Sequence, residues 1–246
     1  MRISIMKDYN LGFISNEDIY RHVKETVGLY RNKIDLGQFN SNIIDPIKLT
    51  FDSKIYGKTF EEIIEAECIR QVDKTNTNHI GYFHQNLFKY VGNGWEVPTK
   101  GFDVINNERH IFVELKNKHN TMNSGAATSV YANMQNKILH DDQATCMLVE
   151  VIATKSRNEK WNKGGLSHEK IRRVSIDKFY EIVFGDDEAF FKLCAALPDI
   201  LDDVVDELQQ GNIQNSVYEE LSQLSPDTFK SLYLLAFATY DGFQNF

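Results

Sequence analysis

The sequence has only three cysteines, Cys68, Cys146 and Cys194, and no two of them form a CxxC pair. This scarcity excludes a disulfide-stabilised scaffold and argues against a zinc ribbon or a thioredoxin-like redox motif. Scattered single thiols are typical of proteins in a reducing cytoplasm. With four prolines among 246 residues and 42% hydrophobic residues, the composition also excludes collagen-like and disordered chains.

Long apolar runs are missing as well. Residues 1–13 contain no apolar core of signal-peptide length, and the longest late apolar run, residues 232–240, is too short to span a bilayer. We therefore expect a soluble, cytoplasmic protein with no membrane association.

The charge is unevenly distributed along the chain. The net charge is −8, but residues 100–175 carry +4 and residues 176–246 carry −11. A basic middle segment suits contact with phosphates, while the acidic end would face solvent. Charge alone favours the simpler account of an unevenly charged solvated surface over contact with phosphates.

The apolar pattern predicts alternating helices and strands. We expect helices over residues 14–33, from 59, and over 81–91, then a hairpin from strands 101–105 and 110–116. A helix over 124–139 and strands over 146–153 and 173–176 follow. We expect the C-terminal part of the chain, after these strands, to be helical. This order predicts one α/β or α+β domain over residues 1–246, with 186–246 as an acidic helical extension.

Asp103, Glu114 and Lys116 are the residues in which we expect chemistry. Side chains alternate along a strand, so Glu114 and Lys116 share a face. A two-residue loop would place Asp103 diagonal to Glu114, and a four-residue loop would place it directly opposite; both put the three side chains on one face. Two carboxylates so close favour a bound divalent cation, and hard oxygen ligands suit Mg²⁺. A lysine beside them serves the hydrolysis of a phosphodiester.

A second set has the same spacing logic. Asp45 with Asp52-Ser53-Lys54 also gives an acid, a gap, and an acid two residues before a lysine. We prefer the hairpin set because its strand is strongly apolar at alternate positions and turn residues separate its two acids. The alternative account of the hairpin set is a surface ion-pair network.

Three runs of sequence resemble a known family: residues 101–103 with 113–121, residues 67–85, and residues 173–183. They are similar to PD-(D/E)xK nucleases, and more narrowly to type II restriction endonucleases of the group that cuts GGNCC. The resemblance extends from about residue 57 to 185. Phe102 stands where a proline usually precedes the first acid.

The resemblance implies a mixed central sheet flanked by helices and Mg²⁺-dependent cleavage of double-stranded DNA by a prokaryotic homodimer. It also implies a cognate methyltransferase that protects host DNA. Asp103 and Glu114 become metal ligands and Lys116 the general base or transition-state stabiliser. A further acid on the preceding helix is expected, with Glu67 preferred over Glu62 and Glu65.

Polar residues around this core are candidates for DNA contact. Each also has an ordinary explanation as a turn, cap or solvated residue. They are Lys118, Asn117, Asn120 and Thr121 after the hairpin; Arg70, Lys74 and Asn76 after a helix; and Lys155, Arg157 and Arg173. Lys155 and Arg157 belong to a basic loop over residues 155–168, which includes Trp161 and which we expect to contact a DNA groove.

Three functions compete. The first is a sequence-specific restriction endonuclease, the second a repair or junction-resolving nuclease on the same scaffold, and the third a non-catalytic DNA-binding protein. Sequence-defined cutting separates the first two, and dependence on Mg²⁺ and Glu114 separates both from the third.

Overall fold

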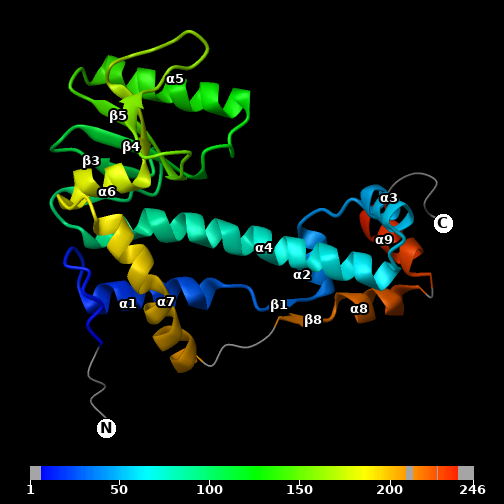
Figure 1. Ribbon diagram of the computed structural model, residues 1–246. Coiled ribbons are helices and arrows are strands. Elements are labelled where there is room, and N and C mark those ends of the chain that lie inside the picture. Colours follow the sequence, from blue (N-terminus) through cyan, green and yellow to red (C-terminus); the bar gives the residue numbers. More distant parts are fainter. Residues whose placement is uncertain (1–6, 209–212, 226, 238–246) are drawn as a thin grey trace. The chain divides into compact units, whose positions relative to one another are not determined.

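The computed structural model describes residues 7–208, 213–225 and 227–237 (Figure 1). Their contacts group into two compact units, each assembled from segments distant in sequence. Unit 1 takes its residues from 1–28 and 80–208, and unit 2 from 29–79 and 209–246. That the whole chain folds as a single domain stays a prediction.

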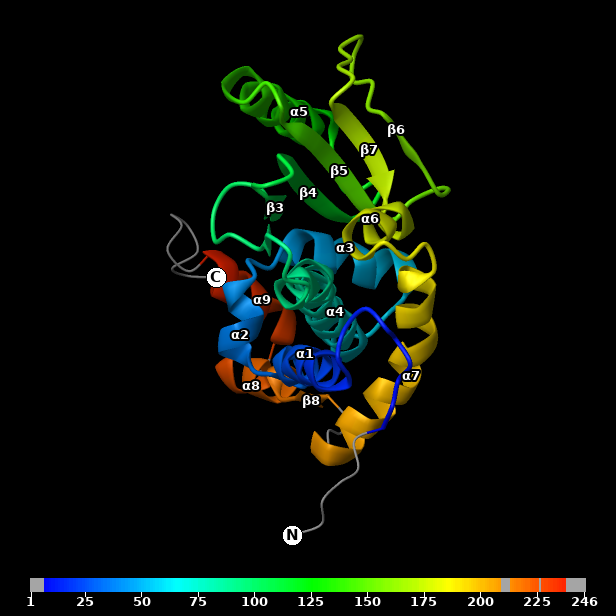
Figure 2. The same ribbon diagram turned by 90° about the vertical axis from the view of Figure 1, so that its left-hand side faces the viewer.

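Unit 1 is built on a six-stranded mixed sheet in the order β2-β3-β4-β5-β7-β6. The three central strands β4, β5 and β7 run parallel, and β2, β3 and β6 pair antiparallel at the edges (Figure 2). The bounds are β2 Trp95–Glu96, β3 Val104–Asn106, β4 Ile111–Lys118, β5 Thr145–Ile152, β6 Asn158–Lys160 and β7 Ile171–Ser175. The expected hairpin and both later strands are present.

Helices cover both faces of this sheet. Helix α5 (Ser124–His140) packs on one face through Ala127, Tyr131 and Met134. The opposite face packs against α1 (Asn16–Leu29), α6 (Ile176–Phe184) and α7 (Ala189–Leu208) in the larger apolar cluster. Figure 1 shows α5 and α6 on opposite sides of the strands. The predicted α/β class, a mixed central sheet flanked by helices, is confirmed.

Short polar residues set where these helices begin. Ser15 Oγ accepts the Asp18 N–H at 3.0 Å and starts α1. Asn123 Oδ1 accepts the Ala126 N–H at 2.8 Å and starts α5. This second cap fixes the point at which the chain leaves the end of β4 and turns onto the sheet.

Helix α4 (Phe60–Asn86) corrects the prediction of two helices with a polar end between them. It is continuous and is followed by the 3₁₀ turn Leu87–Tyr90. The Thr and Asn residues in its middle have low helix propensity. A tertiary contact outweighs that preference: Asn76 Oδ1 accepts the Arg31 N–H at 3.0 Å.

Unit 2 has its own apolar core around Phe39, Ile64, Cys68 and Leu221. A two-stranded parallel ladder joins its two chain segments. Its elements, besides most of α4, are β1 Lys33–Ile34, α2 Leu36–Ser41, α3 Pro46–Tyr56, β8 Gln214–Asn215, α8 Val217–Leu224 and α9 Thr228–Phe237.

The segment expected to be one helical extension, residues 186–246, is divided between the two units. Helix α7 belongs to unit 1, whereas α8 and α9 belong to unit 2. The helical prediction is correct for these three elements, apart from the short strand β8. None of the helices within the described ranges is both long and apolar enough to cross a membrane.

Candidate active site

The β3–β4 hairpin brings Asp103 and Glu114 together. Val104 pairs with Val113 and Asn106 with Ile111, so residues 107–110 form a four-residue loop. Continued by one residue, this register places Asp103 opposite Glu114. Of the two registers that the sequence left open, the structure has the four-residue loop.

Two hydrogen bonds fix Asp103 to β4. Its backbone N–H donates to the Val113 carbonyl at 2.9 Å, and its Oδ2 accepts the Leu115 N–H at 2.7 Å. Burial raises the pKa of Asp103 above its ordinary value, and the nearby Glu114 charge raises it further; the Leu115 hydrogen bond and the Lys116 charge oppose this change. The Asp103 carboxylate is therefore held in place, but the nearby positive charge of Lys116 does not offset the effect of burial on its pKa.

Glu114 and Lys116 lie on the same face of β4 and pair with each other. The Lys116 Nζ donates to Glu114 Oε1 at 2.6 Å, and both side chains are partly exposed. Alternate residues Val113 and Leu115 are buried in the core on the other face. The apolar alternation of the strand thus aims the two charged side chains away from that core.

The donor set fits a small hard cation. Asp103 Oδ1 and Glu114 Oε2 accept no hydrogen bond from the described residues, so each carboxylate has a free oxygen. Mg²⁺ typically binds one or two carboxylates and keeps waters or phosphate oxygens elsewhere. Within the described ranges, no group of three or more His, Cys, Asp or Glu residues is placed so that it could hold a metal ion.

A pocket of about 330 Å³ opens beside Glu114. Gly101 and Phe102 line it from the hairpin side. Helix α5 contributes one face of its surface, since its lining residues recur at helical spacing. These are Val130, Asn133, Asn136, Lys137 and His140. The pocket gives Glu114 access to a polar molecule from outside the sheet.

A buried carboxylate that the sequence analysis missed lies on the same face. Glu150 of β5 pairs with Lys116 across the ladder, has 0% exposure, and binds both Arg157 and Arg173. Its position within the apolar run 146–153 was the available signal, because a charged residue in a buried strand requires partners.

Comparisons with known proteins identify the family of this chain. The family model described as Eco47II restriction endonuclease matches residues 11–206. The chain is 33% identical to the type II restriction enzyme Sau96I of Staphylococcus aureus over 217 residues, which are 82% of this chain and 83% of that protein. It is 31% identical to the type II restriction enzyme Eco47II of Escherichia coli over 220 residues, 82% and 91% of the two chains.

This chain belongs to the Eco47II restriction endonuclease family. The resemblance seen in the sequence is confirmed at the level of a type II restriction enzyme. The matched region of this family member contains all the predicted site residues, from Glu67 to Arg173.

Of the residues predicted to contact DNA after the hairpin, Lys118 lies at the exposed end of β4 on the face of Lys116. Asn117 lies on the opposite face by strand alternation. Thr121 closes the turn after β4, where its Oγ1 donates to the Lys118 carbonyl at 2.9 Å. Asn120 is exposed in that turn. Lys118 is thus the one of the four whose place continues the face of the hairpin acids.

The basic loop expected over residues 155–168 is partly ordered as strand β6, which corrects that prediction. Lys155 is exposed near Glu159, but the Arg157 side chain is only 9% exposed because it binds Glu150. Trp161 is buried, packing on Tyr131 with ring centroids 5.2 Å apart. The loop was misread because its apolar Trp161 was grouped with the surrounding basic residues.

The remaining candidates belong to unit 2. The Glu67 carboxylate is buried and accepts hydrogen bonds from Arg70 at 2.6 Å and Gln71 at 3.0 Å. Burial alone would raise the pKa of Glu67, but these hydrogen bonds outweigh it and hold the pKa below its ordinary value. Lys74 is exposed on the same helix, and Asn76 binds the Arg31 backbone. The catalytic role of Glu67 stays a prediction.

The competing acids have structural contacts. Glu62 forms a capping box with Thr59 at the start of α4, and Glu65 is exposed. In the rival set, Asp45 caps α3 by accepting the Lys48 N–H at 3.0 Å, and Asp52 pairs with Lys48. Because the rival set lies on a helix rather than a hairpin, its similar spacing does not produce the same juxtaposition of acids.

Proposed function

We propose that the protein is a type II restriction endonuclease that hydrolyses phosphodiester bonds of double-stranded DNA at a short palindromic site, GGNCC, in a Mg²⁺-dependent reaction. The observation that carries this proposal is Asp103 opposite Glu114, with Lys116 on the same face, in a member of a restriction endonuclease family. The GGNCC target rests on the resemblance to enzymes that cut that sequence.

Mg²⁺ bound to Asp103 and Glu114 would lower the pKa of a water molecule and neutralise charge on the phosphate. The protein residues position the reactants. The pocket beside Glu114 admits the phosphodiester, and Asp103, tied to Val113 and Leu115, cannot swing away from that position. Rigid placement of this kind lowers the entropic part of the barrier.

Lys116 has two roles available in this arrangement. In its neutral form its Nζ accepts a proton from the attacking water, and in its charged form it stabilises negative charge that accumulates on the phosphate oxygens. The water oxygen forms the new bond to phosphorus while the bond to the 3′ oxygen breaks. The leaving oxygen takes up a proton, which gives 5′-phosphate and 3′-hydroxyl ends.

Two equivalent active sites can cut the two strands of a palindrome at equivalent positions. A homodimer with a two-fold axis supplies them, and it is the expected state of this enzyme. The whole chain would form one nuclease domain acting in the cytoplasm of a prokaryote, where a cognate methyltransferase protects the host DNA.

The test is digestion of plasmid DNA of known sequence with Mg²⁺ or with EDTA, beside a Glu114→Ala variant. We expect discrete fragments that map to GGNCC and that disappear with EDTA or in the variant. Fragments mapping elsewhere would remove the target assignment alone. Cutting of branched DNA regardless of sequence would favour a junction-resolving nuclease, and binding without any cleavage would favour a DNA-binding protein.

A further inference from the structure

The active-site face of the sheet continues beyond the hairpin into a second charged group. Glu114 pairs with Leu148, and Leu148 pairs with Arg173, so these positions form one row across β4, β5 and β7. Neighbouring strands lie about 4.8 Å apart. Arg173 therefore originates two strands from Glu114 on the same face of the same sheet.

Glu150 holds the Arg173 guanidinium from one side. The Arg173 Nε lies 2.9 Å from Glu150 Oε1, and Nη2 lies 2.5 Å from the same oxygen. Nη2 also approaches the His119 carbonyl at 3.5 Å, which ties the guanidinium to the end of β4. Its other terminal nitrogen, Nη1, makes no hydrogen bond within the described ranges, and 28% of the side chain is exposed. The edge that carries Nε and Nη2 is therefore bound to Glu150, and Nη1 is left to contact a ligand.

The charges of this group do not balance. Glu150 is fully buried and is paired by Arg157 and Arg173. Arg157 also lies 3.7 Å from Glu159, which lies 3.9 Å from Lys155, so the cluster has two negative and three positive charges. Arg157, 9% exposed, is sufficient to pair the buried carboxylate. Arg173, with 28% of its side chain exposed, is therefore the arginine that can offer its charge to a ligand.

We propose that Arg173 binds a DNA phosphate next to the scissile one, and that Glu150 is the positioning residue that orients it. This inference rests on the proposed function. It adds to it a phosphate-binding residue, Arg173, and a positioning residue, Glu150, whose own side chain does not contact the substrate. The side-on contact pre-organises the planar guanidinium, and an arginine fixed in this way binds phosphate at a smaller entropic cost than a free side chain.

Arg172 provides a matched control. It is the neighbouring residue on β7, points to the other face by strand alternation, and binds Asn158 rather than Glu150. Arg172→Ala and Arg173→Ala remove the same side chain and the same charge from adjacent positions of one strand. Arg173→Ala leaves Glu150 paired with Arg157, so the variant is expected to fold.

The experiment measures binding of a duplex containing the site, in EDTA, at several salt concentrations, together with cleavage in Mg²⁺. We expect Arg173→Ala to weaken binding roughly 10- to 100-fold and to reduce the slope of log Kd against log salt by about 0.9, the change for one lost phosphate contact. Arg172→Ala should change neither quantity comparably. Equal effects of the two variants, or an Arg173→Ala variant with a lower melting temperature and an unchanged salt slope, would overturn the proposal.

Glu150 is tested by combination. Glu150→Gln keeps the shape and one acceptor oxygen but removes the charge that orients Arg173. If Glu150 acts through Arg173, Glu150→Gln weakens binding in the wild-type background but adds little in the Arg173→Ala background. Additive losses would contradict the positioning role. The wild-type protein tests the proposed function independently of the variants. If it neither binds nor cuts DNA, the proposed function itself is refuted.

Discussion

Asp103 Oδ2 accepts the Leu115 backbone N–H at 2.7 Å, so the first acid is hydrogen-bonded to the strand that carries the second acid and the lysine. Leu115, which lies between Glu114 and Lys116 in the sequence, is itself buried in the core. The spacing of the three charged side chains is therefore set by backbone pairing and core packing rather than by flexible side-chain contacts. This relationship makes the effects of isosteric substitutions in the hairpin predictable.

Asp103→Asn should abolish cleavage without unfolding the protein. Asparagine retains the acceptor oxygen for the Leu115 N–H but loses the charge needed to hold a cation, and we expect kcat to fall at least about 100-fold. Measured melting temperatures should stay within a few degrees. Asp45→Asn is the matched control, since Asn caps a helix as well as Asp and should leave activity unchanged. Loss of activity in the Asp45 variant instead would shift the active site to the rival set.

Lys116→Met should lower kcat more than it weakens DNA binding. The methionine preserves the length of the side chain but removes its proton-transfer and charge-stabilising capacity, which corresponds to about 100- to 1000-fold in kcat. Cleavage and binding are measured on the same duplex. Lys178→Met, which removes a partly exposed lysine paired with Glu181 on α6, is the control. A Lys116→Met enzyme with normal kcat would leave the lysine as an ion-pair partner of Glu114.

Trp161→Ala should destabilise the fold rather than weaken DNA contact. Trp161 is buried against Tyr131 within a segment first read as a DNA-contacting loop. Removal of a large buried aromatic side chain costs about 3–5 kcal/mol of unfolding free energy. Denaturant titration measures this loss, and Lys155→Ala, at an exposed position of the same segment, should cost less than about 0.5 kcal/mol. Comparable stabilities of the two variants would contradict the burial of Trp161.

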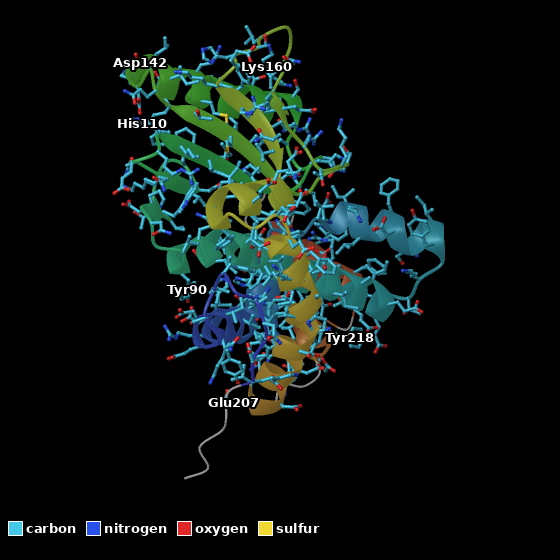
Figure 3. All side chains as sticks on the ribbon, turned by 60° about the vertical axis from the view of Figure 1, so that its left-hand side comes forward. Tyr90, His110, Asp142, Lys160, Glu207 and Tyr218 are labelled. Carbon is cyan, nitrogen blue, oxygen red and sulfur yellow. The ribbon has the colours of Figure 1, made fainter. Side chains whose placement is uncertain are left out.

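The arrangement of the charged side chains on the β3–β4 hairpin was predictable because its information is local. Alternation of apolar residues from Ile111 to Leu115 assigns Glu114 and Lys116 to one face whatever the loop. The loop length was not predictable in the same way. His110, labelled in Figure 3, adopts a left-handed backbone conformation with φ of 52°. This conformation is common for glycine and uncommon for other residues, so the histidine gave no signal of the turn.

Features that depend on distant partners were missed for a physical reason. The polar middle of α4 looks like a helix end, and only contacts such as that of Asn76 with the Arg31 backbone keep it helical. Glu150 looks anomalous in its apolar strand until arginines distant in sequence pair with it. The burial of Arg157 on Glu150 depends on pairing of β6 with β7, which the sequence did not reveal, and its contact with DNA stays a prediction.

His84 should make the protein less stable as the solution becomes acidic. Burial lowers the pKa of His84 from 6.5 to about 4, and the neighbouring His22, whose own pKa is lowered by burial, adds to the effect. The folded state therefore resists protonation that the unfolded chain accepts. The stability contribution is complete above pH 6.5 and is lost as the pH falls toward 4, by up to about 3 kcal/mol.

Unfolding free energies between pH 7.5 and about 4.5 measure this loss. His84→Phe should flatten the acid side of the profile, because phenylalanine does not titrate, whereas His140→Gln on the exposed face of α5 should leave it unchanged. An acid slope that persists in the His84 variant would assign the sensitivity to other groups.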